Sequence, residues 1–157
     1  MRGLAPGMLE VEVTESAVMA DVSTAARLLG RLRELGIRVS IDDFGTGHAS
    51  LAYLKDLPVD AIKIDRIFIR NLSSDQADWG IVQAAVALAR NLGLDVVAEG
   101  VEDRTALALL REMGCTIVQG YLLSRPLPAS ELVPRLRAAQ EGKSWLAAEP
   151  LVSSATG

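Results

Sequence analysis

The sequence predicts an α/β fold, an incomplete (β/α)8 barrel of the TIM type with five parallel strands and outer helices. Short apolar runs alternate with longer segments of helical periodicity, a pattern typical of parallel sheets covered by their crossover helices. Polar residues also lie near the C-terminal end of each run, as expected where all strands face one barrel mouth. A doubly wound sheet would instead gather such residues near one switch point.

The five expected strands are short, and three of them follow a similar joint. The strands are predicted over Leu9–Thr14, Arg38–Asp42, Ala61–Asp65, Asp95–Glu99 and Thr116–Gln119. The joints read RELGIRVSID, ARNLGLDVVAE and REMGCTIVQ, and in each of them a helical segment stops at Leu-Gly or Met-Gly before the next strand. This recurrence predicts a degenerate βα repeat.

Helices are expected between these strands and after the last one. Apolar residues at helical spacing predict helices over Asp21–Leu35 and Gln76–Leu92, each followed by a glycine. Asp103 is predicted to cap a third helix and Ser130 a fourth. The segment from Glu141 onward has no periodicity and is predicted to be a disordered tail.

Composition excludes several classes of protein. The net charge of −4, with no cluster of lysine and arginine, argues against binding of long nucleic acid through its phosphates. No apolar run reaches the roughly 18 residues of a membrane span, and no apolar signal segment opens the chain. The single cysteine, Cys115, excludes an internal disulfide. We therefore expect a cytoplasmic location.

Polar residues near the strand ends are expected to converge at the barrel mouth. They are Glu12, Asp42, Lys63, Asp65, Glu99 and Gln119. Carboxylate oxygens without a cysteine or histidine cluster suit hard ions, Mg²⁺ or Mn²⁺ first and Ca²⁺ next. Two such ions could activate a water molecule and stabilise the leaving oxygen of a phosphoryl transfer. The pattern therefore indicates a divalent-metal site.

The adjacent pair Asp42 and Asp43 leaves two interpretations open. Strict alternation along a strand turns neighbouring side chains to opposite faces. Both carboxylates can face the mouth only if the strand breaks at Asp43, which the following Phe44 and Gly45 would permit. In the alternative, one aspartate caps the next helix and the other is solvated.

The other candidate residues also have structural alternatives. Glu12 could be a solvated edge residue, Glu99 could cap the next helix, and Lys63 and Asp65 could pair with each other. In the functional interpretation, Lys63 holds the attacking water or the developing negative charge. Three further residues are expected to lie on the surface or to pack rather than to act in chemistry: His48, Trp79 and Trp145.

Five motifs in this order resemble the EAL-domain cyclic di-GMP phosphodiesterases: VEVTES, IDDFGTG, AIKID, VAEGVE and QGYLLSRPLP. The resemblance extends from about Leu4 to Leu136, so residues 1–140 would be the C-terminal portion of an EAL domain. It implies a (β/α)8 barrel that acts in bacterial signalling. Such a domain hydrolyses cyclic di-GMP to the linear dinucleotide with Mg²⁺ or Mn²⁺. It also implies a homodimer formed through the loop Phe44–Leu51.

The resemblance further implies a role for each matching residue. The metal ligands of a two-metal site would be Glu12, Asp42, Asp43 and Glu99. The catalytic residues would be Lys63, which positions the nucleophilic water, together with Asp43 and Glu99. The supporting residues would be Glu15, which anchors the loop Phe44–Leu51, then Asp65 beside Lys63, and Gln119. The residues that contact the nucleotide are not specified.

Two family features precede the VEVTES motif and have no counterpart in this chain. They are the Glu-Ala-Leu strand and a later strand that carries an asparagine ligand. A complete barrel of this type has about 250 residues, so we expect a truncated domain with little or no turnover by itself. The alternative is a non-catalytic regulatory module that binds cyclic di-GMP or a protein partner.

Overall fold

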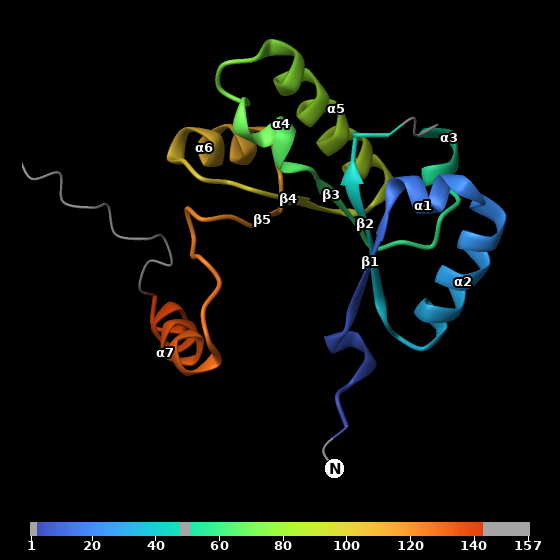
Figure 1. The fold of residues 1–157 in the computed structure, drawn as a ribbon, viewed down its shortest axis with the longest axis horizontal. Coiled ribbons are helices and arrows are strands. Elements are labelled where there is room, and N and C mark those ends of the chain that lie inside the picture. Colours follow the sequence, from blue (N-terminus) through green and yellow to red (C-terminus); the bar gives the residue numbers. More distant parts are fainter. Residues whose placement is uncertain (1–2, 48–50, 143–157) are drawn as a thin grey trace, which may run out of the picture.

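A computed structural model describes residues 3–47 and 51–142 of the chain (Figure 1). These residues form one five-stranded parallel sheet whose strands are arranged in sequence order. The predicted strand order and direction are confirmed. The strands are β1 (Glu10–Thr14), β2 (Arg38–Phe44), β3 (Ala61–Ile64), β4 (Asp95–Ala98) and β5 (Ile117–Val118). His48, Trp145 and the expected tail from residue 143 onward lie outside the described residues.

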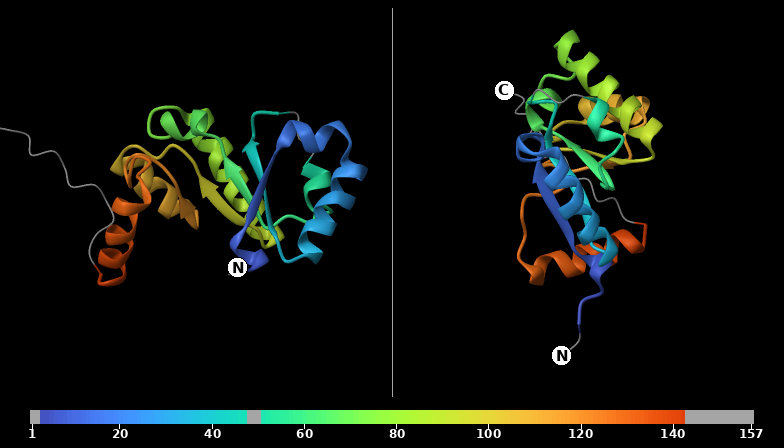
Figure 2. Two further views of the ribbon diagram at one scale, coloured as in Figure 1. Left: turned by 60° about the horizontal axis from the view of Figure 1, so that its bottom comes forward. Right: turned by 90° about the vertical axis from the view of Figure 1, so that its right-hand side faces the viewer.

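Helices α1 to α6 lie around the outside of the curved sheet, and α7 stands apart after a long connection (Figures 1 and 2). The predicted helices are confirmed in α2, α5, α6 and α7, whereas the short helices α1 and α4 were not expected. The elements are η1 (Pro6–Met8), α1 (Glu15–Ala20), α2 (Val22–Glu34), α3 (Leu51–Leu54), α4 (Arg66–Arg70), α5 (Gln76–Leu92), α6 (Arg104–Met113) and α7 (Ala129–Gln140). Among the described residues, no helix combines the length and the apolarity needed to cross a membrane.

The two faces of the sheet differ in chemistry. Ile41, Ile62 and Val96 lie side by side in register and are at most 2% exposed, packed with helix residues in one apolar core. Burying each such side chain stabilises the fold by about 1.5–3 kcal/mol. Because strand side chains alternate, the opposite face carries Glu12 and Lys63. The apolar face thus fixes the sheet and leaves the concave face for polar groups.

Aspartate side chains cap helices α2, α4, α5 and α6. Asp21 accepts a hydrogen bond from the Thr24 backbone N–H at 3.0 Å, Asp75 from Ala77 at 2.7 Å, and Asp103 from Ala106 at 2.8 Å. These bonds satisfy backbone donors that have no partner within the helix. The cap predicted for Asp103 is confirmed.

The predicted cap of the last helix is wrong. Helix α7 begins at Ala129 with Pro128 in the capping position, and no side chain caps it, so Ser130 already lies inside the helix. Pro128 has φ −64° and ψ 153°, and its fixed φ lets the chain enter the helix there without a donor to satisfy. No residue of α7 is buried, and Leu136 on it is 47% exposed.

The cap at Asp21 predicts a dependence of stability on acid. Hydrogen bonds from the Thr24 backbone and from the Thr24 and Ser23 side chains lower the pKa of Asp21 from 3.8 to about 2. Since the pKa is lower in the folded state, this stabilisation is complete above pH 3.8 and is lost as pH falls through about 2. We expect Asp21→Asn to reduce the fall in the free energy of unfolding between pH 4 and pH 2.

Urea unfolding at several pH values measures this effect. Ser23→Ala is the matched control, because it removes only the hydroxyl that donates to Asp21 at 2.8 Å. It should therefore change the acid dependence less than Asp21→Asn does. An unchanged acid dependence in Asp21→Asn would contradict the assignment.

Candidate active site at the C-terminal end of the sheet

Strand β2 runs through the paired aspartates to Phe44, two residues beyond its predicted end. Ile41 lies opposite Ile62 and Phe44 opposite Ile64, so β2 carries one extra residue in a β-bulge. Asp43 has φ 56°, in the left-handed region that a bulge uses. The strand therefore continues through Asp43, but the bulge interrupts its strict alternation there. Because the bulge keeps both Ile41 and Phe44 buried in the core, neither aspartate has to enter it.

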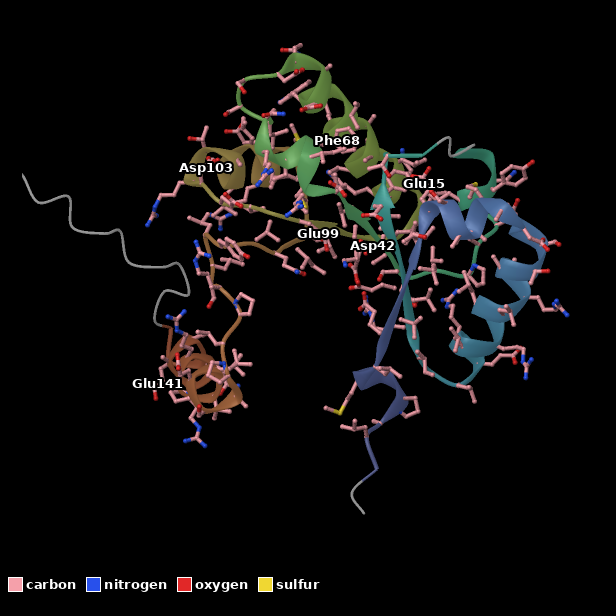
Figure 3. All side chains as sticks on the ribbon, viewed as in Figure 1. Glu15, Asp42, Phe68, Glu99, Asp103 and Glu141 are labelled. Atoms are coloured by element: carbon pink, nitrogen blue, oxygen red, sulfur yellow. The ribbon has the colours of Figure 1, made fainter. Side chains whose placement is uncertain are left out.

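Lys63 lies at the centre of a cluster of carboxylates. Its Nζ atom is 2.7 Å from Glu12 Oε1, 2.7 Å from Glu99 Oε1 and 3.3 Å from Asp42 Oδ1. These residues belong to β1, β2 and β3 and to the position directly after β4, and Figure 3 shows Asp42 and Glu99 beside the same end of the sheet. The Lys63 side chain is only 7% exposed. Four neighbouring strands thus place their polar side chains at one rim.

This cluster carries excess negative charge. Burial alone would lower the pKa of Lys63, but hydrogen bonds to Glu12 and Glu99 outweigh it and raise the pKa above its usual value. Burial raises the pKa of Asp43, as do its hydrogen bond with the Asp65 side chain and repulsion by Asp42. One ammonium group therefore faces several carboxylates, an arrangement that a further cation would stabilise.

The carboxylates fit a divalent cation by their chemistry. Across residues 3–47 and 51–142, no three acidic, histidine or cysteine side chains are close enough together to hold an ion by themselves. Asp42 Oδ1 is nonetheless buried and, apart from its ion pair with Lys63, makes no hydrogen bond within the described residues. Carboxylate oxygens are the ligands that Mg²⁺ and Mn²⁺ prefer. The residues present fit part of such a coordination sphere.

Glu15 joins helix α1 to the segment after β2. It is the first residue of α1, is only 2% exposed, and accepts a hydrogen bond from the Gly45 backbone N–H at 2.9 Å. Gly47 approaches its Oε1 so closely that a Cβ there would overlap the carboxylate. Oε1 has no hydrogen-bond partner among the described residues. This buried carboxylate therefore holds the start of the segment that follows Asp43.

Asp65 and Gln119 lie outside the Lys63 cluster. Asp65 was expected within a strand, but β3 ends at Ile64, and Asp65 caps α4 by accepting a hydrogen bond from the Ile67 N–H at 2.7 Å. The alternative pairing of Lys63 with Asp65 is wrong, because Glu12, Asp42 and Glu99 are the partners of the lysine. Gln119 is exposed, and within the described residues its side chain makes no hydrogen bond, although its backbone pairs with Ala98 and Val101.

Two further features of the site were not predicted from the sequence. Ser40 faces the site side of the sheet next to Glu12 in register, and it is completely buried. A polar residue inside the apolar run RVSI was the signal for it. The left-handed backbone at Asp43 has no such signal, because it arises in the bulge that the register of β2 against β3 sets.

The described residues form an open parallel sheet of the α/β-barrel class. Acidic side chains and a lysine lie at the C-terminal ends of its strands. The model of the EAL domain matches residues 1–126, so the chain belongs to the EAL-domain family. It is 57% identical over 136 residues to the cyclic di-GMP phosphodiesterase NbdA of Pseudomonas aeruginosa, covering 87% of this chain and 17% of that protein. It is 49% identical over 130 residues to the bifunctional diguanylate cyclase/cyclic di-GMP phosphodiesterase MucR of the same organism, covering 83% and 19%.

Solved structures confirm the fold class. The PaMucR phosphodiesterase in complex with c-di-GMP has a TM-score of 0.80 at 50% identity, over 82% of this chain and 52% of that one. The Klebsiella pneumoniae BlrP1 complex with manganese and cyclic di-GMP has a TM-score of 0.73 at 36% identity, over 78% and 31%. The chain therefore spans about half or less of these structures, and about a fifth of the curated relatives.

Proposed function

We propose that this chain is the C-terminal part of a cyclic di-GMP phosphodiesterase domain, which hydrolyses one phosphodiester bond to give the linear dinucleotide. The observation that carries the proposal is the cluster in which Glu12, Asp42 and Glu99 surround Lys63 at one rim of the sheet. The names of NbdA and MucR, both cyclic di-GMP phosphodiesterases, support the substrate.

The carboxylates at the rim would hold Mg²⁺ or Mn²⁺. The ligands from this chain would be Glu12, Asp42, Asp43 and Glu99, and the buried Oδ1 of Asp42 supports this assignment. The manganese and calcium complexes of BlrP1 support a divalent ion. Such ions, when bound, generate a nucleophile from water and stabilise the charge on the leaving oxygen.

The chain's own side chains would orient the reaction around these ligands. Lys63, whose pKa is raised by its carboxylate partners, stays charged and would hold the attacking water or the developing negative charge. Glu15 would fix the segment that follows Asp43, through its bond to Gly45. Asp65 would orient Asp43 through the hydrogen bond between their side chains.

The proposed location is the cytoplasm, and the proposed assembly is a homodimer through the loop Phe44–Leu51. The first residues of this loop and helix α5 line an apolar cavity of about 290 Å³. Ile81 in its wall is 40% exposed, an apolar surface that a second copy would cover.

Turnover by a completed domain tests the function. The chain would be joined to the preceding part of the phosphodiesterase domain of MucR, whose structure it matches. With Mn²⁺ and cyclic di-GMP, we expect the linear dinucleotide to form, and EDTA to stop its formation. A folded domain that binds cyclic di-GMP without hydrolysing it would instead indicate a regulatory binding module.

We expect the chain alone to show little or no turnover and to associate. Strands β1 and β5 are the two edges of the described sheet, and unpaired edges recruit other chains. The remaining carboxylates should bind Mn²⁺ weakly. The test mixes purified chain with cyclic di-GMP and Mn²⁺ and measures its mass in solution; fast turnover by a monomer would contradict this expectation.

A further inference from the structure

The backbone that carries Glu99 is held by hydrogen bonds from both sides. On one side, the Glu99 N–H donates to the Ile64 carbonyl at the end of β3, at 3.1 Å. On the other side, the Val101 N–H donates to the Gln119 carbonyl at 3.0 Å, and the Leu122 N–H donates to the Val101 carbonyl at 3.0 Å. Residues 99–101 thus extend the sheet between β3 and the segment after β5.

Two glycines permit this close packing. A Cβ at Gly120 would overlap the backbone N, C and O atoms of Val101, whose side chain is fully buried. Gly100 has φ +68°, and a Cβ there would lie 2.5 Å from Cβ of Arg66. In both places the obstacle is backbone or the rigid root of a side chain, so a rotamer change cannot relieve it.

We propose that Gly120 is a positioning residue for Glu99. Its missing side chain lets the segment after β5 lie directly on Val101, and this contact sets the backbone from which the Glu99 carboxylate reaches Lys63 Nζ at 2.7 Å. Any side chain at position 120 would push residues 99–101 away from that segment. The effect of Gly120 on catalysis rests on the proposed function, whereas its contact with Val101 does not.

A double-mutant cycle on the metal-free chain tests the coupling. The unfolding equilibrium constant would be measured for the parent, Gly120→Ala, Glu99→Gln and the combination of both. The fold-change that Glu99→Gln causes in this constant is then compared between the parent and the Gly120→Ala background. If Gly120 positions Glu99, the two fold-changes differ by at least about threefold. A merely structural glycine would leave the two effects additive.

Gly80→Ala is the matched control. No atom lies within 4 Å of a Cβ at Gly80, which is in helix α5, so its effect should add to that of Glu99→Gln. Additivity within about twofold for both glycines would overturn the proposal. Turnover by the completed domain tests the proposed function. It is not measured in this cycle, so the two proposals can fail independently.

Hydrogen exchange covers the case in which Gly120→Ala does not fold. Glu99→Gln keeps the shape of the side chain but weakens its ion pair with Lys63. The backbone at residues 99–101 should then open more often, so the Val101 and Leu122 amides should exchange at least about threefold faster than in the parent. The Leu94 amide, bonded to the Ala89 carbonyl at the other end of the sheet, should be unchanged. Equal exchange at Val101 and Leu122 in both proteins would overturn the coupling.

Discussion

Replacing Asp42 with alanine in the completed domain is expected to lower hydrolysis of cyclic di-GMP by about 10³-fold or more. Asp42 lies in the β2 bulge with its Oδ1 buried and 3.3 Å from Lys63 Nζ. Its removal would take away a proposed metal ligand and disturb Lys63, which is proposed to hold the attacking water. The rate of formation of the linear dinucleotide at saturating Mn²⁺ measures the loss.

Asp56→Ala is the matched control for this change. Asp56 is an exposed aspartate in the turn after α3, so its removal should leave the rate nearly unchanged. A loss of less than about tenfold in Asp42→Ala would show that Asp42 is not a metal ligand, and the rim would then need another explanation.

Lys63→Met is expected to destabilise the chain by about 2 kcal/mol, because it leaves several partly buried carboxylates without their cation. This figure lies below that for a fully buried pair, because Glu12 is 49% exposed and Asp42 25% exposed. Urea unfolding of parent and variant measures the difference. Lys55→Met, at an exposed lysine, should change stability by less than about 0.5 kcal/mol.

The stabilisation of the fold by Lys63 should also decrease at high pH. Its pKa is higher in the folded chain than the ordinary value of 10.5. Its stabilisation is therefore complete below pH 10.5 and is lost as pH rises further. The difference between parent and Lys63→Met should be constant from pH 7 to pH 9 and shrink above pH 10.5; a difference that grows there would contradict the ion pairs.

The sequence predicted the sheet well because its signals are local and repeated. Apolar residues at helical spacing and a following glycine located α5 at Gln76–Leu92, and Gly93 ends it in the left-handed conformation. The strands β2, β3 and β4 begin at the predicted residues. Strand order followed from the short connections between parallel strands.

The strand ends were predicted less well because tertiary contacts decide them. The bulge at Asp43 depends on the register of β2 against β3, which no local pattern encodes. Asp65 leaves the sheet because its carboxylate caps α4, and the same sequence could have continued a strand. Glu15 could be assigned to the loop only through the family resemblance, since its partner Gly45 is 30 residues away.

The position of Mn²⁺ in crystals of the completed domain shows whether the carboxylates at this rim hold a metal ion. Anomalous scattering locates the ion without any assumption about the reaction. We expect Mn²⁺ in contact with carboxylate oxygens of Glu12, Asp42 and Glu99, with Lys63 beside them. Mn²⁺ bound away from this rim, with Lys63 still paired to all three carboxylates, would contradict this expectation.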